Sequence, residues 1–145
     1  DFSRPAGQRG RTMKTKRRMT GLGGIFFKAK NPKKLQAWYR KHLGLPLDPA
    51  WGGWTFEWRD AKAPQKKGCT VWSAFDADTA CFKPSKKPFM INYRVANLRR
   101  VLAELKREGV WVDPKTEESE FGKFGWVMDG EGNRIELWQP PRAKG

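Results

Sequence analysis

The fold is decided by two copies of one pattern that begin 66 residues apart, Ile25-Phe-Phe-Lys-Ala-Lys-Asn-Pro-Lys-Lys-Leu-Gln-Ala37 and Ile91-Asn-Tyr-Arg-Val-Ala-Asn-Leu-Arg-Arg-Val-Leu-Ala103. Each copy starts with the alternation of a strand, passes through an Asn and continues with the spacing of an amphipathic helix. The same offset relates Cys69-Thr-Val-Trp72 to Ile135-Glu-Leu-Trp138. Two matches at one spacing predict a duplicated unit.

The two predicted helices carry start and stop signals. Asn31 and Asn97 are suited to cap their first turns, and Pro32 suits a first helical position. Gly44 and Gly109 are placed to end them in a left-handed conformation. The apolar positions predict one apolar face on each helix, made of Leu35, Trp38, Tyr39 and Leu43 on the first and of Leu98, Val101, Leu102 and Leu105 on the second.

Further strands are predicted downstream of each helix. Trp54–Trp58 alternates large aromatic residues with Thr and Glu, and Val110–Asp113 and Phe124–Met128 are candidates in the second half. A turn over Asp129–Asn133 leads into a last strand, Arg134–Gln139. Each half is therefore predicted as a strand, a helix and three strands. The predicted organisation is a flexible basic tail (1–20), a first module (21–75), a linker (76–87), a second module (88–141) and a C-terminal tail (142–145).

The charge is strongly basic. The 145 residues hold 30 Lys and Arg against 15 Asp and Glu, a net charge of +15. Residues 1–20 contain seven of the basic residues and one acid, with too few apolar side chains to fold alone. This tail is either an arm for a nucleic acid or an acidic partner, or a segment foreign to the native protein, and we favour the second interpretation.

The composition excludes several kinds of site. The chain has one histidine, His42, so a site built from two or more imidazoles is ruled out. Two cysteines, Cys69 and Cys81, form neither a disulfide framework nor a zinc knuckle, and no histidine is placed to activate them. No apolar run approaches the roughly 18 residues of a membrane span. Without such a span and without a secretory signal, we expect a cytoplasmic protein that does not bind membranes.

Two motifs resemble one known superfamily. Trp38-Tyr-Arg-Lys-His-Leu-Gly-Leu45 is similar to the "FYxxxLGL" helix end, and Asp129-Gly-Glu-Gly-Asn-Arg-Ile-Glu-Leu-Trp138 to the "DPxGNxIEL" signature, of the vicinal oxygen chelate superfamily (glyoxalases, bleomycin-resistance proteins and extradiol dioxygenases). With the repeat, the resemblance covers about residues 21–141. It implies an α+β fold of two tandem βαβββ modules, whose strands form a curved, barrel-like mixed sheet around a shared cleft. It also implies a homodimer.

The resemblance further implies where a metal would bind. Metal-dependent members take a His or Gln from the first strand of a module and a Glu or similar ligand from its last strand. Carried over by position, the four places here are Gly24, Thr70, Met90 and Glu136. Only Glu136 suits a divalent ion, since Gly24 has no side chain, Thr70 is a poor ligand and the Met90 thioether prefers soft ions. We therefore predict no cofactor, and a divalent metal is disfavoured.

Strand alternation predicts which side chains line the cleft. Ile25, Phe27, Ala29, Ile91, Tyr93 and Val95 have the parity that packs under the helices. The candidate ligand-binding residues have the opposite parity or lie beside it: Phe26, Lys28, Thr70, Trp72, Met90, Asn92, Arg94 and Trp138, with Glu136 as the candidate catalytic residue. Such a mixture suits a small organic molecule with an apolar body and a few polar groups.

Each of these residues has a structural alternative. Glu136 either pairs with Arg94 or Lys28 inside the barrel or, if unpaired, has a raised pKa and serves as a general base. The aromatic residues are either core or the walls of a ligand site, and core is the more common role in a small domain. His42, in the last turn of its helix, is expected to be a solvated cation rather than a catalytic residue.

Three functions remain. The preferred one is a glyoxalase/bleomycin-resistance-like binding protein that needs no metal and holds a neutral or anionic organic ligand in an aromatic cleft. The alternative is a lyase, isomerase or dioxygenase of the same superfamily with Glu136 as base or metal ligand. The third is a nucleic-acid binder that uses the basic charge, and it ranks last because no nucleic-acid motif is present.

Overall fold

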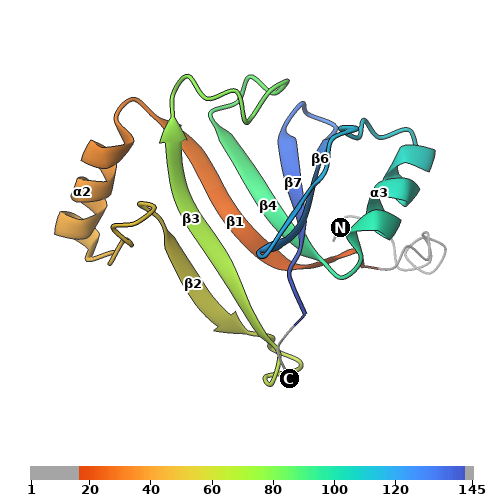
Figure 1. Cartoon of the computed structure of the whole chain (residues 1–145), viewed down its shortest axis with the longest axis horizontal. Coiled ribbons are helices and arrows are strands. Elements are labelled where there is room, and N and C mark those ends of the chain that lie inside the picture. Colours follow the sequence, from red (N-terminus) through yellow and green to blue (C-terminus); the bar gives the residue numbers. More distant parts are fainter. Residues whose placement is uncertain (1–16, 143–145) are drawn as a thin grey trace, which may run out of the picture.

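One mixed sheet with two helices makes up the computed structural model, which describes residues 17–142. In chain order the elements are β1 (Met19–Ala29), α2 (Pro32–Leu43), β2 (Trp54–Arg59), β3 (Lys67–Asp76), β4 (Phe89–Val95), α3 (Leu98–Arg107), β5 (Glu117–Ser119), β6 (Gly122–Met128) and β7 (Arg134–Gln139). The sheet has seven strands in the order β2-β3-β1-β4-β7-β6-β5. It curves between the two helices, which lie at opposite sides of the view (Figure 1). The predicted α+β class and curved mixed sheet are confirmed.

The centre of the sheet is nearly symmetric. β1 and β4 run antiparallel there, with Ile25 opposite Ile91, Phe26 opposite Met90 and Gly24 opposite Asn92. Each of these strands has a parallel partner from its own half of the chain, β3 beside β1 and β7 beside β4. The offset of 66 residues therefore relates the two central strands.

The halves differ in their strand count. Within residues 17–142, α3 is followed by β5, β6 and β7, but α2 is followed by β2 and β3 only, one strand fewer than predicted. The predicted strand Val110–Asp113 is also wrong, because its segment makes only an isolated bridge between Val112 and Val127. The short strand β5 takes the third place in the second half.

The second sequence match does not describe structurally equivalent residues. Ile25 of β1 pairs with Trp72 of β3, whereas Ile91 of β4 pairs with Ile135 of β7. Trp72, and not Cys69, is therefore the counterpart of Ile135. The register of the last strand of each half, β3 or β7, therefore differs by three residues from the sequence match.

Both helices begin and end as predicted. The Asn31 and Asn97 side chains accept hydrogen bonds from the Lys34 and Arg100 backbone N–H groups, at 3.0 and 3.1 Å. Gly44 ends α2 with a φ of 66°, a left-handed conformation that glycine adopts without strain. No helix in the described part of the chain is long and apolar enough to cross a membrane.

Two apolar clusters hold the sheet. The helix-side cluster, under α3, comprises Val95, Leu98, Val101, Val127 and Leu137. The cleft cluster, on the other face, comprises Phe26, Phe82, Met90 and Trp126. Phe82, which is fully buried, comes from the segment predicted as a linker, so that segment is part of the core.

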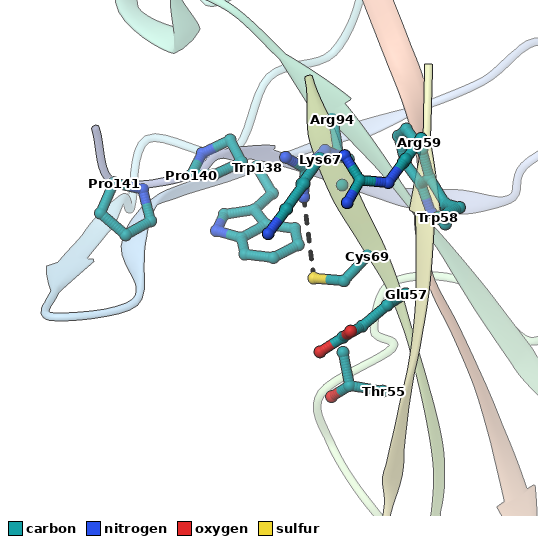
Figure 2. Close-up of a pocket in the computed structure, with 11 residues that line it drawn as sticks. Thr55, Glu57, Trp58, Arg59, Lys67, Cys69, Arg94, Trp138, Pro140 and Pro141 are labelled. Atoms are coloured by element: carbon teal, nitrogen blue, oxygen red, sulfur yellow. Dashed lines mark hydrogen bonds between the residues drawn. The ribbon is translucent and has the colours of Figure 1, made fainter. Parts of the chain in front are cut away.

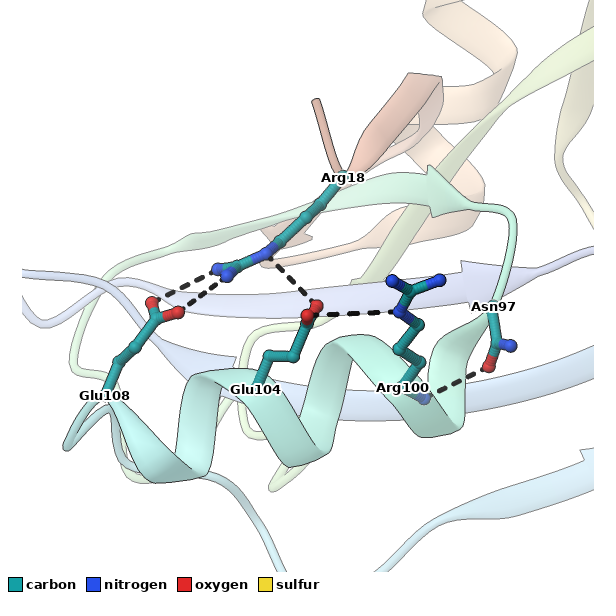
Figure 3. A network of polar contacts seen from close by, with 5 residues as sticks. All are labelled: Arg18, Asn97, Arg100, Glu104 and Glu108. Carbon is teal, nitrogen blue, oxygen red and sulfur yellow. Dashed lines mark hydrogen bonds and ion pairs between the residues drawn. The ribbon is translucent and has the colours of Figure 1, made fainter. Parts of the chain in front are cut away.

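The tail boundary lies earlier than predicted. β1 starts at Met19, inside the expected tail, and Arg18 is already fixed (Figure 3). Its guanidinium donates to both Glu108 carboxylate oxygens, at 3.1 and 2.6 Å, and lies 3.5 Å from Glu104. Residues 1–16 and 143–145, where the rest of the two predicted tails falls, lie outside the described residues.

Candidate ligand-binding cleft

The concave face of the sheet encloses a cavity of about 750 Å³, which we call the inner pocket. Its walls come from all of β1, β2, β3, β4, β6 and β7 and from the segments that flank them. The lining residues are Gly23, Phe26, Trp51, Thr55, Cys69, Val71, Asn92, Glu120, Phe121, Phe124, Glu136, Trp138 and Pro141. Aromatic and other apolar residues make up most of this lining, and its polar members are Thr55, Cys69, Asn92, Glu120 and Glu136, a mixture that is typical of a site for an organic ligand.

Glu136 is the partly buried acid of the inner pocket. Its Oε1 accepts a hydrogen bond of 2.6 Å from Asn92 Nδ2, and its Oε2 accepts one of 2.9 Å from Trp126 Nε1. Burial raises the pKa of Glu136, while the Asn92 and Trp126 donors act in the opposite direction by favouring the carboxylate. Neither Arg94 nor Lys28 pairs with it, so of the two alternatives for Glu136 the ion pair inside the barrel is wrong.

The Asn92 side chain is held between Glu136 and a glycine. Asn92 is 2% exposed, and its Oδ1 has no hydrogen-bond donor in the described part of the chain. This oxygen lies against Gly23, where a Cβ would come within 2.1 Å of it. Gly23 is the extra residue of a bulge in β1, between Leu22 opposite Tyr93 and Gly24 opposite Asn92. A side chain at this position would collide with the group that orients Glu136.

A second cavity of about 640 Å³, the outer pocket, adjoins the first (Figure 2). The two share Thr55, Cys69, Trp138 and Pro141, so they are compartments of one cleft. The outer pocket adds the basic side chains of Arg59, Lys67 and Arg94, with Glu57 as its acid. The cleft therefore changes along its length from a largely apolar compartment that holds Glu120 and Glu136 to a basic one.

Arg94 lies between two indole rings in the outer pocket. Its guanidinium carbon is 5.5 Å from the centre of the Trp58 ring and 5.0 Å from that of Trp138. Nη1 lies 3.8 Å from the Cys69 sulfur, the one side-chain polar contact of Arg94 among the described residues (Figure 2). The rings hold the cation in place through cation–π attraction and leave most of its donors available.

The structure brings five of the nine candidate site residues to the cleft. Phe26, Asn92, Glu136 and Trp138 line the inner pocket, and Arg94 lines the outer one. These residues lie on β1, β4 and β7, whose mutual registers keep their predicted parity.

Four candidates lie elsewhere. Trp72 is on the helix side, where its ring is 4.8 Å from that of Tyr39 on α2. The Thr70 hydroxyl is used internally, because it donates to the Leu22 carbonyl and accepts from Trp58 Nε1. Met90 is buried in the cleft cluster, and the Lys28 ammonium lies over the Phe82 ring, 5.7 Å from its centre.

Sequence reasoning missed the residues of β3 and β2 that do line the cleft. Phe26 pairs with Ser73, so Val71 and Cys69, at the same parity, face the cleft in place of Thr70 and Trp72. Thr55, opposite Val71, follows from the same register. The alternation of these strands was visible in the sequence, but their registers were not.

The residues at the metal-binding places of the resembled superfamily do not suit a divalent ion. Met90 is packed against hydrocarbon, and the space beside Gly24 is taken by the Phe26 ring, 2.8 Å from where a Cβ would be. By register, Ser73 and not Thr70 is the counterpart of Glu136, and a hydroxyl is also a poor ligand. Within residues 17–142, no three His, Cys, Asp or Glu side chains come together as a metal-binding group.

The curved sheet and its cleft have the fold that solved structures of the vicinal oxygen chelate superfamily share. Among solved structures, the chain is similar to the methylmalonyl-CoA epimerase of Mycobacterium tuberculosis (TM-score 0.59, 19% identity, covering 92% of this chain and 96% of that one). It is also similar to a variant of the Streptomyces coelicolor methylmalonyl-CoA epimerase in complex with 2-nitronate-propionyl-CoA (TM-score 0.61, 15% identity, covering 86% of this chain and 99% of that one).

A third similar structure is a glyoxalase/bleomycin resistance protein/dioxygenase superfamily member from Vibrio splendidus 12B01 (TM-score 0.52, 10% identity, 81% and 98% coverage). No family model matches the sequence, and no curated protein matches it either. The resemblance drawn from the two motifs is therefore supported by structure, at the level of the fold.

Proposed function

We propose that this chain is a glyoxalase/bleomycin-resistance-like protein that binds a small organic molecule in its aromatic cleft without a metal ion. The observation that carries the proposal is the contrast within the cleft. An apolar cavity of about 750 Å³ remains open, while the places that would grip an ion are filled by Met90 and the Phe26 ring. A site that has lost its ion ligands but kept its volume is suited to binding through shape and a few polar contacts.

The ligand proposed is neutral or anionic. The inner pocket has two carboxylates: Glu120 lies at its exposed rim, and Glu136 already accepts two hydrogen bonds. Arg59, Lys67 and Arg94 at the outer pocket outnumber Glu57. Because a strongly cationic ligand would meet these charges on entry, the electrostatics of the cleft disfavour it.

A thermal-shift screen with aromatic acids, phenols and amides, run with and without EDTA, tests the proposal. We expect at least one class to raise the melting temperature equally in both conditions. Thr55→Trp, which places a large ring where the two pockets meet, should abolish that shift, whereas Thr116→Trp outside the cleft should retain it. Stabilisation that disappears with EDTA, or a screen in which no compound acts, would contradict the proposal.

The second candidate function is an enzyme of the same superfamily with Glu136 as general base. Its support is the raised pKa of a carboxyl group that faces an apolar pocket, since a base is more effective when its pKa approaches the working pH. Solvent deuterium exchange into a bound carbon acid distinguishes it from pure binding. Exchange that requires Glu136, and is lost in Glu136→Gln while binding persists, would favour the enzyme.

We also propose a homodimer in the cytoplasm. Ile25, on the helix-bearing side of the sheet, and Trp38, on α2, are 39% and 49% exposed, which is high for large apolar side chains. Both cysteines are free thiols, which suits a reducing compartment. Light scattering after size-exclusion chromatography tests the dimer, and Trp38→Glu should convert it to a monomer.

A further inference from the structure

Arg94 is a cation without a matching anion. Among residues 17–142, no carboxylate lies within ion-pair distance of its guanidinium, although other arginines, such as Arg18 and Arg134, do have carboxylate partners. Arg94 is only partly exposed, and its guanidinium carbon lies 5.5 Å from the centre of the Trp58 ring and 5.0 Å from that of Trp138, which restricts its position. A partly desolvated, oriented guanidinium is suited to bidentate binding of a carboxylate or phosphate.

Glu136 supplies the complementary feature at the other end of the cleft. Its carboxylate can only accept hydrogen bonds while ionised, and its two oxygens offer about four lone-pair positions, of which Asn92 and Trp126 use two. Because Glu136 is partly exposed and lines the inner pocket, a further donor can reach it from the cavity. A ligand group placed there must carry an O–H or N–H.

The register fixes the spacing between the two features. Asn92 pairs with Glu136, and Arg94, two residues further along β4, pairs with Trp138. Two residues of a strand span about 7 Å, so the backbone positions that carry the two groups are about that far apart along β4. The Trp138 ring, which stacks on Phe124 with an interplanar angle of 4°, forms a flat apolar wall between the two pockets.

We propose that the cleft recognises a flat organic acid by both ends, with its anionic group on Arg94, its apolar body along Trp138 and a hydroxyl or N–H donor on Glu136. The ligand class is therefore a rigid, mostly aromatic molecule that carries an anion and a hydrogen-bond donor at opposite ends. This inference rests on the proposed function and adds the chemical class of its ligand.

Three small-molecule probes test the recognition of the two ends of the ligand separately. 4-Hydroxyphenylacetate carries both groups, phenylacetate lacks the donor, and 2-(4-hydroxyphenyl)ethanol lacks the anion. We expect dissociation constants, measured by NMR titration at constant ionic strength, to be at least tenfold higher for each of the two single-function probes. In a Cys81→Ser background, protection of Cys69 from iodoacetamide shows whether a probe occupies the cleft, because Cys69 lines both pockets.

Substitutions at position 94 then test the role of Arg94. Arg94→Gln should weaken 4-hydroxyphenylacetate at least tenfold and leave 2-(4-hydroxyphenyl)ethanol within twofold, while Arg94→Lys should keep most of the anion preference. Arg99→Gln, the same charge change on the exposed surface of α3, should change neither constant. The melting temperature of each variant, and its unchanged affinity for the neutral probe, show that the cleft is still folded.

The outcomes of these experiments distinguish a failure of this inference from a failure of the proposed function. If 2-(4-hydroxyphenyl)ethanol protects Cys69 as well as 4-hydroxyphenylacetate does, the cleft binds organic molecules but the two-ended recognition is wrong. If Arg99→Gln weakens the acid as much as Arg94→Gln, general charge and not Arg94 attracts it, and the inference is again wrong. If no probe protects Cys69, the inference fails, and the wider screen with EDTA decides the proposed function separately.

Discussion

Compared with the wild type, the Glu136→Gln variant should become more stable as the pH rises. In the folded protein, burial raises the pKa of Glu136 above the value it has in the unfolded chain. The folded state therefore binds more protons than the unfolded state between those two pKa values, and the free energy of unfolding falls as the pH rises through that window. Glutamine has no such titration, so the difference between variant and wild type should grow with pH and then level off.

The size of the effect follows from the contacts of the carboxylate. Each unit by which the pKa is raised corresponds to about 1.4 kcal/mol. The glutamine can still accept from Trp126, and its amide can donate to Asn92 Oδ1, which lacks a donor in the wild type. From pH 4.5 to pH 8.5 we expect the variant to gain about 1–3 kcal/mol on the wild type, since burial of the charge costs more than its two hydrogen bonds return.

Urea denaturation followed by tryptophan fluorescence, at half-unit pH steps, measures the difference. The matched control is Glu120→Gln, which removes a carboxylate at the exposed rim of the same pocket and should not reproduce the trend of Glu136→Gln. The reasoning would be refuted if Glu136→Gln and wild type ran parallel over the whole range, or if the variant lost stability relative to wild type as the pH rose.

Three further replacements follow from the same contacts. Gly23→Ala places a Cβ 2.1 Å from Asn92 Oδ1, so urea denaturation should show a loss of about 1–3 kcal/mol, the usual cost of overpacking; an unchanged midpoint would show that the bulge yields freely. Asp113→Ala removes the partner, at 2.9 Å, of the 7% exposed Arg134 and should cost about 3 kcal/mol at neutral pH. The backbone N–H of Lys115 and the Arg134 guanidinium lower the Asp113 pKa, so the stability contributed by Asp113 is present above the usual carboxyl pKa and is lost as the pH falls through its lowered value. The cost of Asp113→Ala should therefore shrink in acid, and a constant cost would contradict this. Asn97→Ala removes the cap of α3 and should cost about 1 kcal/mol by thermal denaturation, whereas Asn97→Asp should cost little, and equal losses from the two would argue against the cap.

Local signals in the sequence were sufficient for the helices and the central strands. Asn31 and Asn97 cap the helices through short-range bonds that depend only on neighbouring residues. The parity of β1 and β4 also held, because both strands carry the repeated pattern and pair with each other about its centre, at Ile25 and Ile91. These features are local, or follow from the similarity of the two central strands.

The prediction of which β3 residues face the cleft was wrong because the register of this strand does not follow from a local sequence pattern. The sequence match aligned Cys69–Trp72 with Ile135–Trp138, but the ladders differ by three residues between the halves. Because side chains alternate along a strand, a shift by an odd number of residues exchanges the two faces. The residues of β3 that line the cleft are therefore Cys69 and Val71 instead of Thr70 and Trp72. Register depends on packing across the sheet, which one sequence does not disclose.

The cleft cluster has a consequence for the minimal size of this protein. Its four members come from β1, the segment between the halves, β4 and β6, so each half contributes to covering the other. Phe82 has no exposed surface at all in the intact chain. Either half produced alone would present these rings to water, so we expect a fragment that ends between β3 and β4 to self-associate rather than to remain monodisperse.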